Sequence, residues 1–430
     1  MNNSIQNISE DLWSISPKKI QSLNIFWIGF TLYIACYVLK GYRNISLKPF
    51  ELLQFIGLCL FVTKGASLLH TKIKSDYLRT LFILYILWSA TVIFRGIHFN
   101  YDSVKNLLVN ADFGVFPYFA PLILLFPKNL TFYKKLSEAI LVLGIFYLLY
   151  SVLFSRELLS RSEETKGIIE YLANYLGIAC GFILLTYRYH SKRRIVLALT
   201  VMGLSTLFSI YKARRGLSSI CIGVLIASYF LYLFNTKRRV LIIYLSAVAI
   251  VAGAFYVANK YKVKKSGLFT SILERGDEDT RTPVELYFYA DLKAKDWIIG
   301  KGINGQYYCP DIYADQEEDY RSYIETGYLQ IILKGGIVEL FLFLLMTIPA
   351  VILGIFFSKN LLAKAAGIWI LIMLYGLYPA TINTFSLRYL LIWIAVGICF
   401  SKKIRSLSDR NIQMIFETPY KSLLDNKKRV

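Results

Sequence analysis

Arginines and one carboxylate in two polar parts of the chain could act on an anionic substrate. Arg214 and Arg215 stand at the start of an apolar segment, and Arg281 lies in the long polar stretch from about Asn259 to Thr326. A guanidinium presents a rigid fork of donors that suits the oxygens of a phosphate. Glu325 lies near the end of the same polar stretch and is a candidate general base for activating a hydroxyl.

Each of these residues also has an explanation without chemistry. An arginine pair at the end of an apolar segment can anchor a helix by reaching toward lipid headgroups. A glutamate near a helix start interacts favourably with the helix dipole. Arg214 and Arg215 are nevertheless unusual, because the orientation derived below puts them on the side of the membrane where basic clusters are disfavoured. Both explanations stay open at the level of the residues alone.

Metal and cofactor chemistry finds little support in the sequence. The three histidines, His70, His98 and His190, lie far apart, and only Cys309 of the six cysteines falls in a polar stretch. Neither a zinc site nor a disulfide framework is therefore predicted. An acidic run could ligate a divalent cation, although a solvated loop explains it better, because its spacing matches no known ligand loop. This run consists of Asp311, Asp315, Glu317, Glu318 and Asp319. We expect no cofactor and no bound metal.

The elements that must position these residues are apolar segments long enough to cross a membrane. Of the 430 residues, 56% are hydrophobic and only 18% are charged. Windows of about 17 to 22 almost uncharged residues recur, and each could cross a hydrocarbon core of about 30 Å as a helix. The twelve expected spans are Ile20–Leu39, Phe50–Leu69, Leu78–Phe94, Asn106–Phe126, Ala139–Phe154, Gly167–Tyr187, Ile195–Ile210, Gly216–Phe234, Val240–Ala258, Ile337–Phe357, Leu361–Tyr378 and Leu387–Phe400.

The basic residues predict the orientation of these spans. With both termini in the cytoplasm, the basic clusters between spans fall on the inside, as the positive-inside rule requires. The same clusters account for the formal net charge of +21, so nucleic acid is not an expected partner. The predicted organisation is nine spans over residues 1–258, a large periplasmic loop over 259–326, three spans over 327–400, and a basic cytoplasmic tail over 401–430.

The large loop and its end carry local signals of structure. Residues Val284 to Ile299 are rich in Leu, Tyr, Phe and Trp with interspersed Lys and Asp, and they predict one amphipathic helix along the membrane face. Gly300 and Gly302 then predict a tight turn. After Glu325, a short apolar helix should run up to Gly335-Gly336, and the spanning helix should start beyond that pair.

Ionisable residues within the spans raise the alternative of a transporter. Asp112 and Glu170 lie inside predicted spans, where such residues are functional candidates by default, unless they face a water-filled vestibule. A transporter predicts charged residues spread through several spans and only small loops. No internal repeat is evident, and the single large loop with its arginines fits an active site on one face better.

The order of these features resembles the O-antigen polymerase and O-antigen ligase superfamily of bacterial envelope enzymes. Four local matches, which together cover about residues 167–357, carry the resemblance. The first is Glu170–Gly177 (EYLANYLG), which is similar to an Asn-x-x-Ala helix of the family, and the second is Arg214-Arg215-Gly216-Leu217, which is similar to a Ser-Arg-Gly span start. The third is Arg281 with the following aromatic residues and Ile298–Gly302, which is similar to an Arg…aromatic…Leu-Gly-x-Gly loop. The fourth is Glu325–Gln330 with Gly336-Ile337, which is similar to a His-Asn-x-Tyr-Leu-Gln…Gly-Ile-x-Gly segment.

The resemblance implies a metal-independent glycosyltransferase built as a GT-C-like, all-α polytopic bundle. Its donor would be a glycan carried on undecaprenyl diphosphate at the periplasmic face of the inner membrane. By carry-over, Arg215 and Arg281 hold the diphosphate, whose departing oxygens gather negative charge that fixed guanidinium groups stabilise. The residues assigned to substrate binding are Arg214, Arg275, Asn174, Tyr328 and Arg321.

One departure from the family pattern bears on the acceptor. Ligases of the family carry a histidine where this chain has Glu325, and no histidine occurs in the long loop. We therefore expect a polymerase, in which donor and acceptor are both lipid-linked repeat units, with Glu325 as the base and a chain-length regulator as a possible partner. The alternatives are a ligase, whose acceptor is lipid A–core or a protein, and a lipid-linked oligosaccharide transporter.

Overall fold

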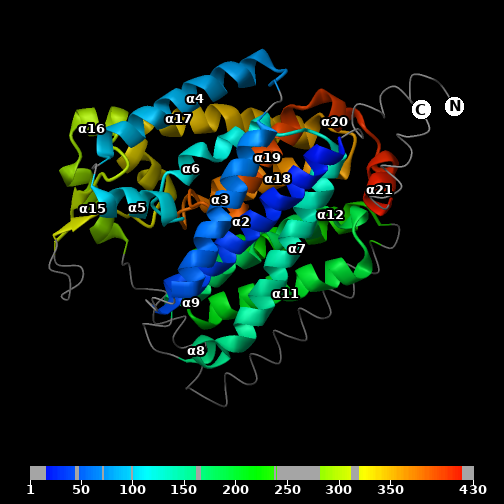
Figure 1. Cartoon of the computed structure of the whole chain (residues 1–430), viewed down its shortest axis with the longest axis horizontal. Helices are drawn as coiled ribbons and strands as arrows, with labels where there is room; N and C mark the ends of the chain where they lie inside the picture. The colour runs from blue at the N-terminus through cyan, green and yellow to red at the C-terminus, as the bar shows by residue number, and fades with distance from the viewer. Residues whose placement is uncertain are drawn as a thin grey trace.

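The computed structural model describes residues 16–43, 48–69, 72–97, 100–160, 166–236, 239, 281–310 and 319–418, and these are mostly helical (Figure 1). Seven helices of this part of the chain are long and apolar enough to cross a membrane. They are α2 (Pro17–Arg43), α3 (Lys48–Leu68), α4 (Asp76–Gly96), α7 (Leu130–Leu153), α11 (Lys192–Tyr211), α12 (Arg215–Phe234) and α17 (Gly327–Phe356). The prediction of an all-α membrane protein is confirmed at this level. The predicted span Val240–Ala258 lies outside the described residues.

The predicted span Asn106–Phe126 is not a continuous helix. Its residues belong to the end of α5 (Tyr101–Val109), a turn, the short helix α6 (Phe116–Phe119) and the 3₁₀ helix η1 (Ala120–Leu125). Pro117 and Pro121 lie at the starts of the latter two helices. Proline lacks the N–H that an α-helix needs in its interior, so it starts new helical segments here rather than continuing one.

The predicted span Gly167–Tyr187 is also interrupted. It contains α9 (Lys166–Tyr171), one turn of π-helix η3 (Leu172–Gly177), α10 (Cys180–Leu185) and the start of the 3₁₀ helix η4 (Tyr187–Tyr189). A π turn inserts an extra residue into the helical ladder and commonly occurs at functional sites. The π turn contains Asn174, one of the predicted substrate-binding residues.

The centre of the bundle is formed by α19 (Leu387–Phe400), which is buried along almost its whole length. A helix that is apolar all round must be surrounded by other elements, and α17, η1 and α18 (Leu361–Gly376) pack around this one. Trp369 of α18 and Trp393 of α19 are fully buried. This packing fixes the position of the connection between α18 and α19, around which the candidate site is built.

A bend divides α17 into two parts. Gly336 has a non-helical backbone (φ 73°, ψ −179°), and a Cβ added there would lie 2.1 Å from the carbonyl oxygen of Ile298. Only glycine fits this combination of left-handed φ and close approach. The predicted break at the glycine pair, with a short helix before it and a spanning helix after it, is confirmed.

The carbonyl groups that the bend releases are bonded by neighbouring elements. Backbone that is not helical inside a membrane protein needs such partners, because lipid offers none. The donors are the backbone N–H groups of Lys301 (to Leu333 O, 2.8 Å) and Gly302 (to Lys334 O, 2.9 Å) and the indole of Trp88 (to Gly335 O, 2.8 Å). The neighbouring elements therefore stabilise the bend.

The described part of the large loop forms a small domain-like cap at one end of the bundle (Figure 1, left). The prediction of one amphipathic helix over Val284–Ile299 is wrong, because the chain turns extended at Lys293 and forms two helices, α15 (Thr282–Asp291) and α16 (Ala294–Ile299). The predicted tight turn is confirmed by φ values of 71° at Gly300 and 84° at Gly302. A two-stranded antiparallel pair follows, β1 (Tyr307–Tyr308) with β2 (Tyr320–Arg321).

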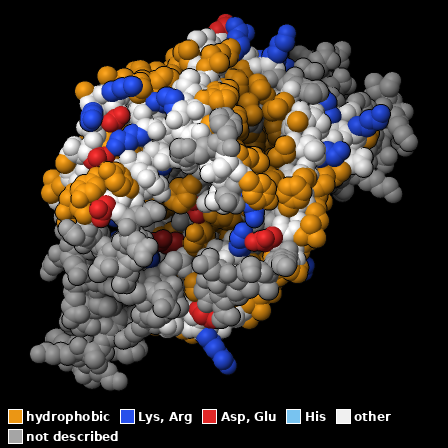
Figure 2. Space-filling view, turned by 60° about the vertical axis from the view of Figure 1, so that its left-hand side comes forward, with side chains coloured by type: hydrophobic (Ala, Val, Ile, Leu, Met, Phe, Trp, Pro, Cys, Tyr) orange, Lys and Arg blue, Asp and Glu red, His pale blue; other side chains and the backbone are white. Residues whose placement is uncertain are grey.

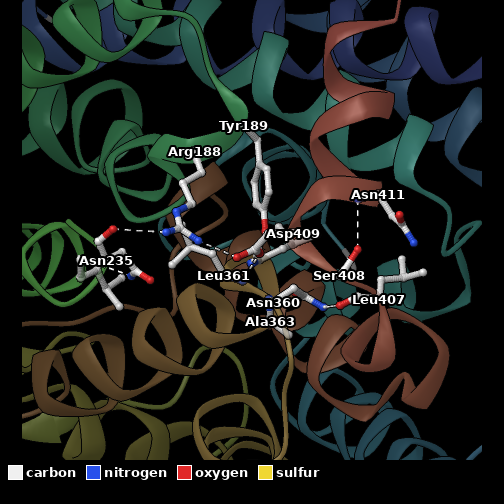
Figure 3. Close-up of polar contacts among 12 residues, drawn as sticks. Arg188, Tyr189, Asn235, Asn360, Leu361, Ala363, Leu407, Ser408, Asp409 and Asn411 are labelled. Carbon is white, nitrogen blue, oxygen red and sulfur yellow. Dashed lines mark hydrogen bonds and ion pairs between the residues drawn. The ribbon is translucent and has the colours of Figure 1, made fainter. Parts of the chain in front are cut away.

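The opposite end of the bundle is closed by two short helices, α20 (Lys402–Ser406) and α21 (Asp409–Glu417), where the sequence predicts a basic tail. Asp409 joins three elements there (Figure 3). Its carboxylate accepts hydrogen bonds from Arg188 Nη1 (2.8 Å), the Tyr189 hydroxyl and the backbone N–H of Leu361 (2.7 Å). The start of α21 therefore caps α18 and holds η4 beside it.

We predict that Asp409→Ala lowers the stability of the detergent-solubilised protein by about 1–3 kcal/mol, because the Leu361 N–H and the Tyr189 hydroxyl lose their acceptor. Thermal unfolding followed by circular dichroism measures this effect. Asp76→Ala is the control, since Asp76 is an exposed residue whose ion pair with Arg79 should contribute little. Equal midpoints for the Asp409→Ala and Asp76→Ala variants would contradict this role of Asp409.

Candidate functional site

The connection between α18 and α19, residues 377–386, brings the candidate residues together. The carbonyl oxygen of Pro379 accepts a hydrogen bond from Arg281 Nη2 (2.8 Å). The hydroxyl of Thr381 donates to the carbonyl oxygens of Ile324 (3.1 Å) and Glu325 (3.3 Å). The 377–386 connection therefore holds both the start of α15 and the segment that leads into α17.

Two glycines let further helix starts approach the same connection. A Cβ added at Gly216, near the start of α12, would lie 2.2 Å from the carbonyl oxygen of Pro379. A Cβ added at Gly327, at the start of α17, would lie 2.5 Å from the carbonyl oxygen of Ala380. The helix starts that carry the predicted arginines and Glu325 therefore converge on one loop.

Two ion pairs form the candidate site. Arg281 Nε lies 3.4 Å from Glu325 Oε2, and Arg214 Nε lies 3.2 Å from Glu170 Oε1, without hydrogen-bond geometry in the latter case. Glu170 also interacts electrostatically with Arg281 and Glu325, so the four charges form one cluster. All four side chains are partly exposed, and such pairs contribute little to stability. Stability alone therefore does not account for this cluster.

The two neighbouring arginines at the start of α12 have different positions. Arg214 is half-buried and takes part in the cluster, whereas the side chain of Arg215 is exposed. The family resemblance gives the diphosphate role to Arg215, but the structure puts Arg214 beside Glu170. Arg214 is the N-cap of α12 and has a non-helical backbone (φ −86°, ψ 79°), whereas Arg215 is the first residue of the helix.

Of the other predicted substrate-binding residues, Arg321 and Tyr328 lie near this cluster. Arg321 and Glu325 both interact electrostatically with the Tyr307 phenol, which puts Arg321 at the edge of the site. Tyr328 is half-buried and faces Tyr289 of α15. Arg275 lies outside the described residues, as do four of the five acidic residues of the predicted cation-binding run. Among the described residues, no group of three or more His, Cys, Asp or Glu could hold a metal ion.

Asn174 has a structural partner that the sequence does not reveal. Its side-chain oxygen accepts a hydrogen bond from Arg388 Nη1 (2.8 Å), and Arg388 Nη2 donates to the Thr381 carbonyl oxygen (3.0 Å). The Arg388 side chain is 1% exposed. A guanidinium at this depth requires bonded partners, so Arg388 ties the π turn η3 to the connection that carries Pro379 and Thr381.

Asp112, a candidate because it lies in an apolar segment, is held by three tyrosines. Its carboxylate accepts hydrogen bonds from Tyr37 (2.7 Å), Tyr171 (3.3 Å) and Tyr175. These phenols come from α2, α9 and η3, so the carboxylate joins three elements beside the cluster. Asp112 also interacts electrostatically with Glu170. Its hydrogen bonds explain its presence without chemistry.

Three buried charged residues near the site are absent from the sequence prediction. They are Arg388, Lys334 and Glu339, with exposures of 1%, 4% and 5%. Each of the three is an ionisable residue within an apolar run of the sequence. Such residues are rare in membrane helices and indicate a function or a specific partner, so this pattern could have identified them as candidates. Their partners lie far away in the chain, so their roles follow only from the fold.

A comparison of the sequence and the structure with protein-family models, with curated proteins and with solved structures found no match. The function must therefore be argued from the geometry and chemistry of the site. Two guanidinium groups beside two carboxylates at the rim of a helical bundle can bind an anion with several oxygens and can accept a proton from a hydroxyl.

We predict that Asn174→Leu lowers the stability of the purified protein by about 1–3 kcal/mol, because the buried Arg388 loses an acceptor. Asn174→Asp should retain most of the stability, since a carboxylate still accepts from the guanidinium. Thermal unfolding in detergent measures both variants. If the Leu variant unfolds at the same temperature as the unmodified protein, Asn174 does not support Arg388.

Proposed function

We propose that this chain is a membrane glycosyltransferase of the O-antigen polymerase type, which joins polyprenyl-diphosphate-linked oligosaccharide units into a surface polysaccharide. The observation that supports this proposal best is the Arg281–Glu325 pair beside the Arg214–Glu170 pair. The cluster lies at the end of the bundle that carries α15 and α16, and Figure 2 shows a hollowed face at this end with acidic and basic side chains among apolar ones.

The proposed reaction breaks one bond and forms one bond at the donor sugar. The C1–O bond to the diphosphate breaks, and the diphosphate leaves with the electron pair. The hydroxyl oxygen of the acceptor sugar forms the new bond to C1, and its proton passes to the carboxylate of Glu325. Arg281 and Arg214 stabilise the negative charge that develops on the leaving diphosphate.

The position of Arg281 suits this role because its guanidinium is held from two sides. One terminal nitrogen donates to the Pro379 carbonyl oxygen, while Nε faces Glu325. A donor that is already oriented needs no reorganisation when charge develops on the leaving group. The carboxylates neutralise the arginines before substrate binds, and an incoming diphosphate would compete with them for the same guanidinium groups.

The surface of α12 suits a lipid-linked substrate. Ile222, Ile226 and Phe230 are 38%, 50% and 50% exposed, and their spacing of four residues forms one apolar stripe that leads away from Arg215. A polyprenyl chain could lie along this stripe while its diphosphate reaches the arginines at the start of the helix.

The glycan profile of a strain that lacks this protein separates the proposed function from its alternatives. A polymerase predicts lipopolysaccharide with a single repeat unit, and a ligase predicts accumulated long lipid-linked polymer. A transporter predicts that the purified protein releases no polyprenyl diphosphate from lipid-linked repeat units. Accumulated long polymer, or the absence of such release by the active preparation, would contradict the proposal.

We predict that Glu325→Gln lowers the rate of polymer formation by the purified protein by about 10²–10⁴-fold, because the acceptor hydroxyl loses its base. Arg281→Lys should lower it about 10²–10³-fold, since an ammonium lacks the planar fork. Product ladders made from lipid-linked repeat units measure the rate. Asp76→Asn and Arg79→Lys alter an exposed ion pair at the far end of α4 and are the matched controls. Full activity of a well-expressed Glu325→Gln variant would exclude this residue as the base.

We predict that Arg214→Gln impairs polymer formation more strongly than Arg215→Gln, because Arg214 forms the ion pair with Glu170 and the side chain of Arg215 is exposed. The two substitutions remove the same charge from adjacent positions, so each serves as the control for the other. Activity with increasing concentrations of lipid-linked donor measures both. A larger loss in Arg215→Gln would favour the assignment that the family resemblance implies.

A further inference from the structure

A small polar pocket lies between α17 and the 377–386 connection. Its walls also include residues of α4, α6 and α19 and of the turns before α6 and after α16. Its water-accessible volume is about 20 Å³, and on this measure one water molecule needs about 10–15 Å³. The pocket therefore has room for one or two water molecules and for no larger ligand.

Two buried acceptors on the wall of this pocket lack a donor. Glu339 is 5% exposed, and one carboxylate oxygen accepts a hydrogen bond from the Tyr85 hydroxyl (3.3 Å), while the other, Oε2, accepts none. The side-chain oxygen of Asn383 is likewise buried without a hydrogen bond. Burying a carboxylate or amide oxygen without a donor costs free energy. The ligand that suits this pocket must therefore donate hydrogen bonds or carry positive charge.

A buried ammonium group on the same wall decides between these two kinds of ligand. Lys334 is 4% exposed, and among the described residues its Nζ donates only to the Gly305 carbonyl oxygen (2.8 Å), one of the three hydrogen bonds that an ammonium can donate. An ammonium repels a metal cation and needs acceptors. A ligand that both donates and accepts is therefore favoured, and a water molecule does both.

The three side chains belong to two irregular parts of the backbone. Lys334 directly precedes the glycine pair at the bend of α17, and a Cβ added at Gly335 would overlap Glu339 Oε2, so the pair also makes room for this carboxylate. Asn383 lies in the 377–386 connection, two residues after Thr381, whose hydroxyl bonds the carbonyl oxygen of Glu325. A ligand that joins the three side chains therefore links the bend to the connection.

We propose that this pocket binds a water molecule that bridges Lys334 to Glu339 and Asn383. The water donates its two hydrogens to Glu339 Oε2 and Asn383 Oδ1 and accepts a hydrogen bond from Lys334 Nζ. Three hydrogen bonds are typical of a buried water. The bridge forms a water-mediated ion pair between two buried charges that make no direct ion pair with each other in the described part of the chain.

X-ray radiolysis of the full-length protein in nanodiscs tests this inference. Hydroxyl radicals that X-rays generate from a bound water oxidise the side chains beside it, and mass spectrometry of the peptides measures the oxidation. Tyr85 and Tyr389 line the pocket and are each 3% exposed, whereas Tyr133 has the same exposure and does not line it. We expect oxidation of Tyr85 and Tyr389 at a dose that leaves Tyr133 unmodified. Equal oxidation of the three tyrosines would overturn the inference.

Two variants of Asn383 test whether the water depends on the bridge. In Asn383→Leu, oxidation of Tyr85 and Tyr389 should fall to the level of Tyr133, because the water loses an acceptor. Asn383→Asp keeps an acceptor at this position and should retain the oxidation of the unmodified protein. Unchanged oxidation in a folded Asn383→Leu variant would overturn the bridge.

A cryo-EM map of the unmodified protein that resolves ordered water tests the same claim without any substitution. We expect density for a water within hydrogen-bond distance of Lys334 Nζ, Glu339 Oε2 and Asn383 Oδ1. A direct contact between Lys334 and Glu339, or density at the shorter distances of a metal ion, would overturn the inference. None of these outcomes depends on polymer formation, so the bridge and the proposed function can fail separately.

Discussion

Irregular backbone inside a membrane protein leaves carbonyl groups that lipid cannot satisfy, and this constraint organises the described part of the chain. Helices break at the π turn η3, at Gly336 and at the 377–386 connection. Cationic side chains from distant elements donate to carbonyl oxygens at or beside these breaks. They are Arg95 (to Ile299 and Gly300), Arg281 (to Pro379), Lys334 (to Gly305) and Arg388 (to Thr381). The π turn and the 377–386 connection are therefore bonded by a guanidinium, whereas neutral N–H groups bond the carbonyls that the bend at Gly336 releases.

The same contacts explain why the candidate functional groups gather at one end of the bundle. A charge that bonds a broken helix must lie near the break, and Arg388 joins the break at η3 to the 377–386 connection, which also bonds Arg281. Burying a charged side chain costs free energy unless it is paired, and the carbonyl groups at these breaks provide such pairing. The irregular backbone therefore positions the polar groups of the site, and the long regular helices hold the irregular segments in place.

The sequence predicts the parts of this arrangement that local chemistry controls. The glycine pair at Gly335-Gly336 and the turn at Gly300 were predictable, because glycine is required where φ is positive. The interruption between Asn106 and Phe126 is not predicted, because the segment is long and apolar enough for one span although Pro117 and Pro121 lack the N–H groups of a helix interior. The partner of Asn174 could not be predicted, because Arg388 lies 214 residues away and only packing brings the two together. For the same reason the sequence cannot decide between two adjacent arginines.

The two polar regions differ in how their charges are balanced, and this difference bears on what each could bind. In the cluster around Arg281, each arginine faces a carboxylate at the partly exposed rim, so an anion can exchange with an existing partner at little cost. Glu339 and Lys334, by contrast, are buried and not paired with each other, and each is bonded by a neutral group of the fold, the Tyr85 hydroxyl for the carboxylate and the Gly305 carbonyl for the ammonium.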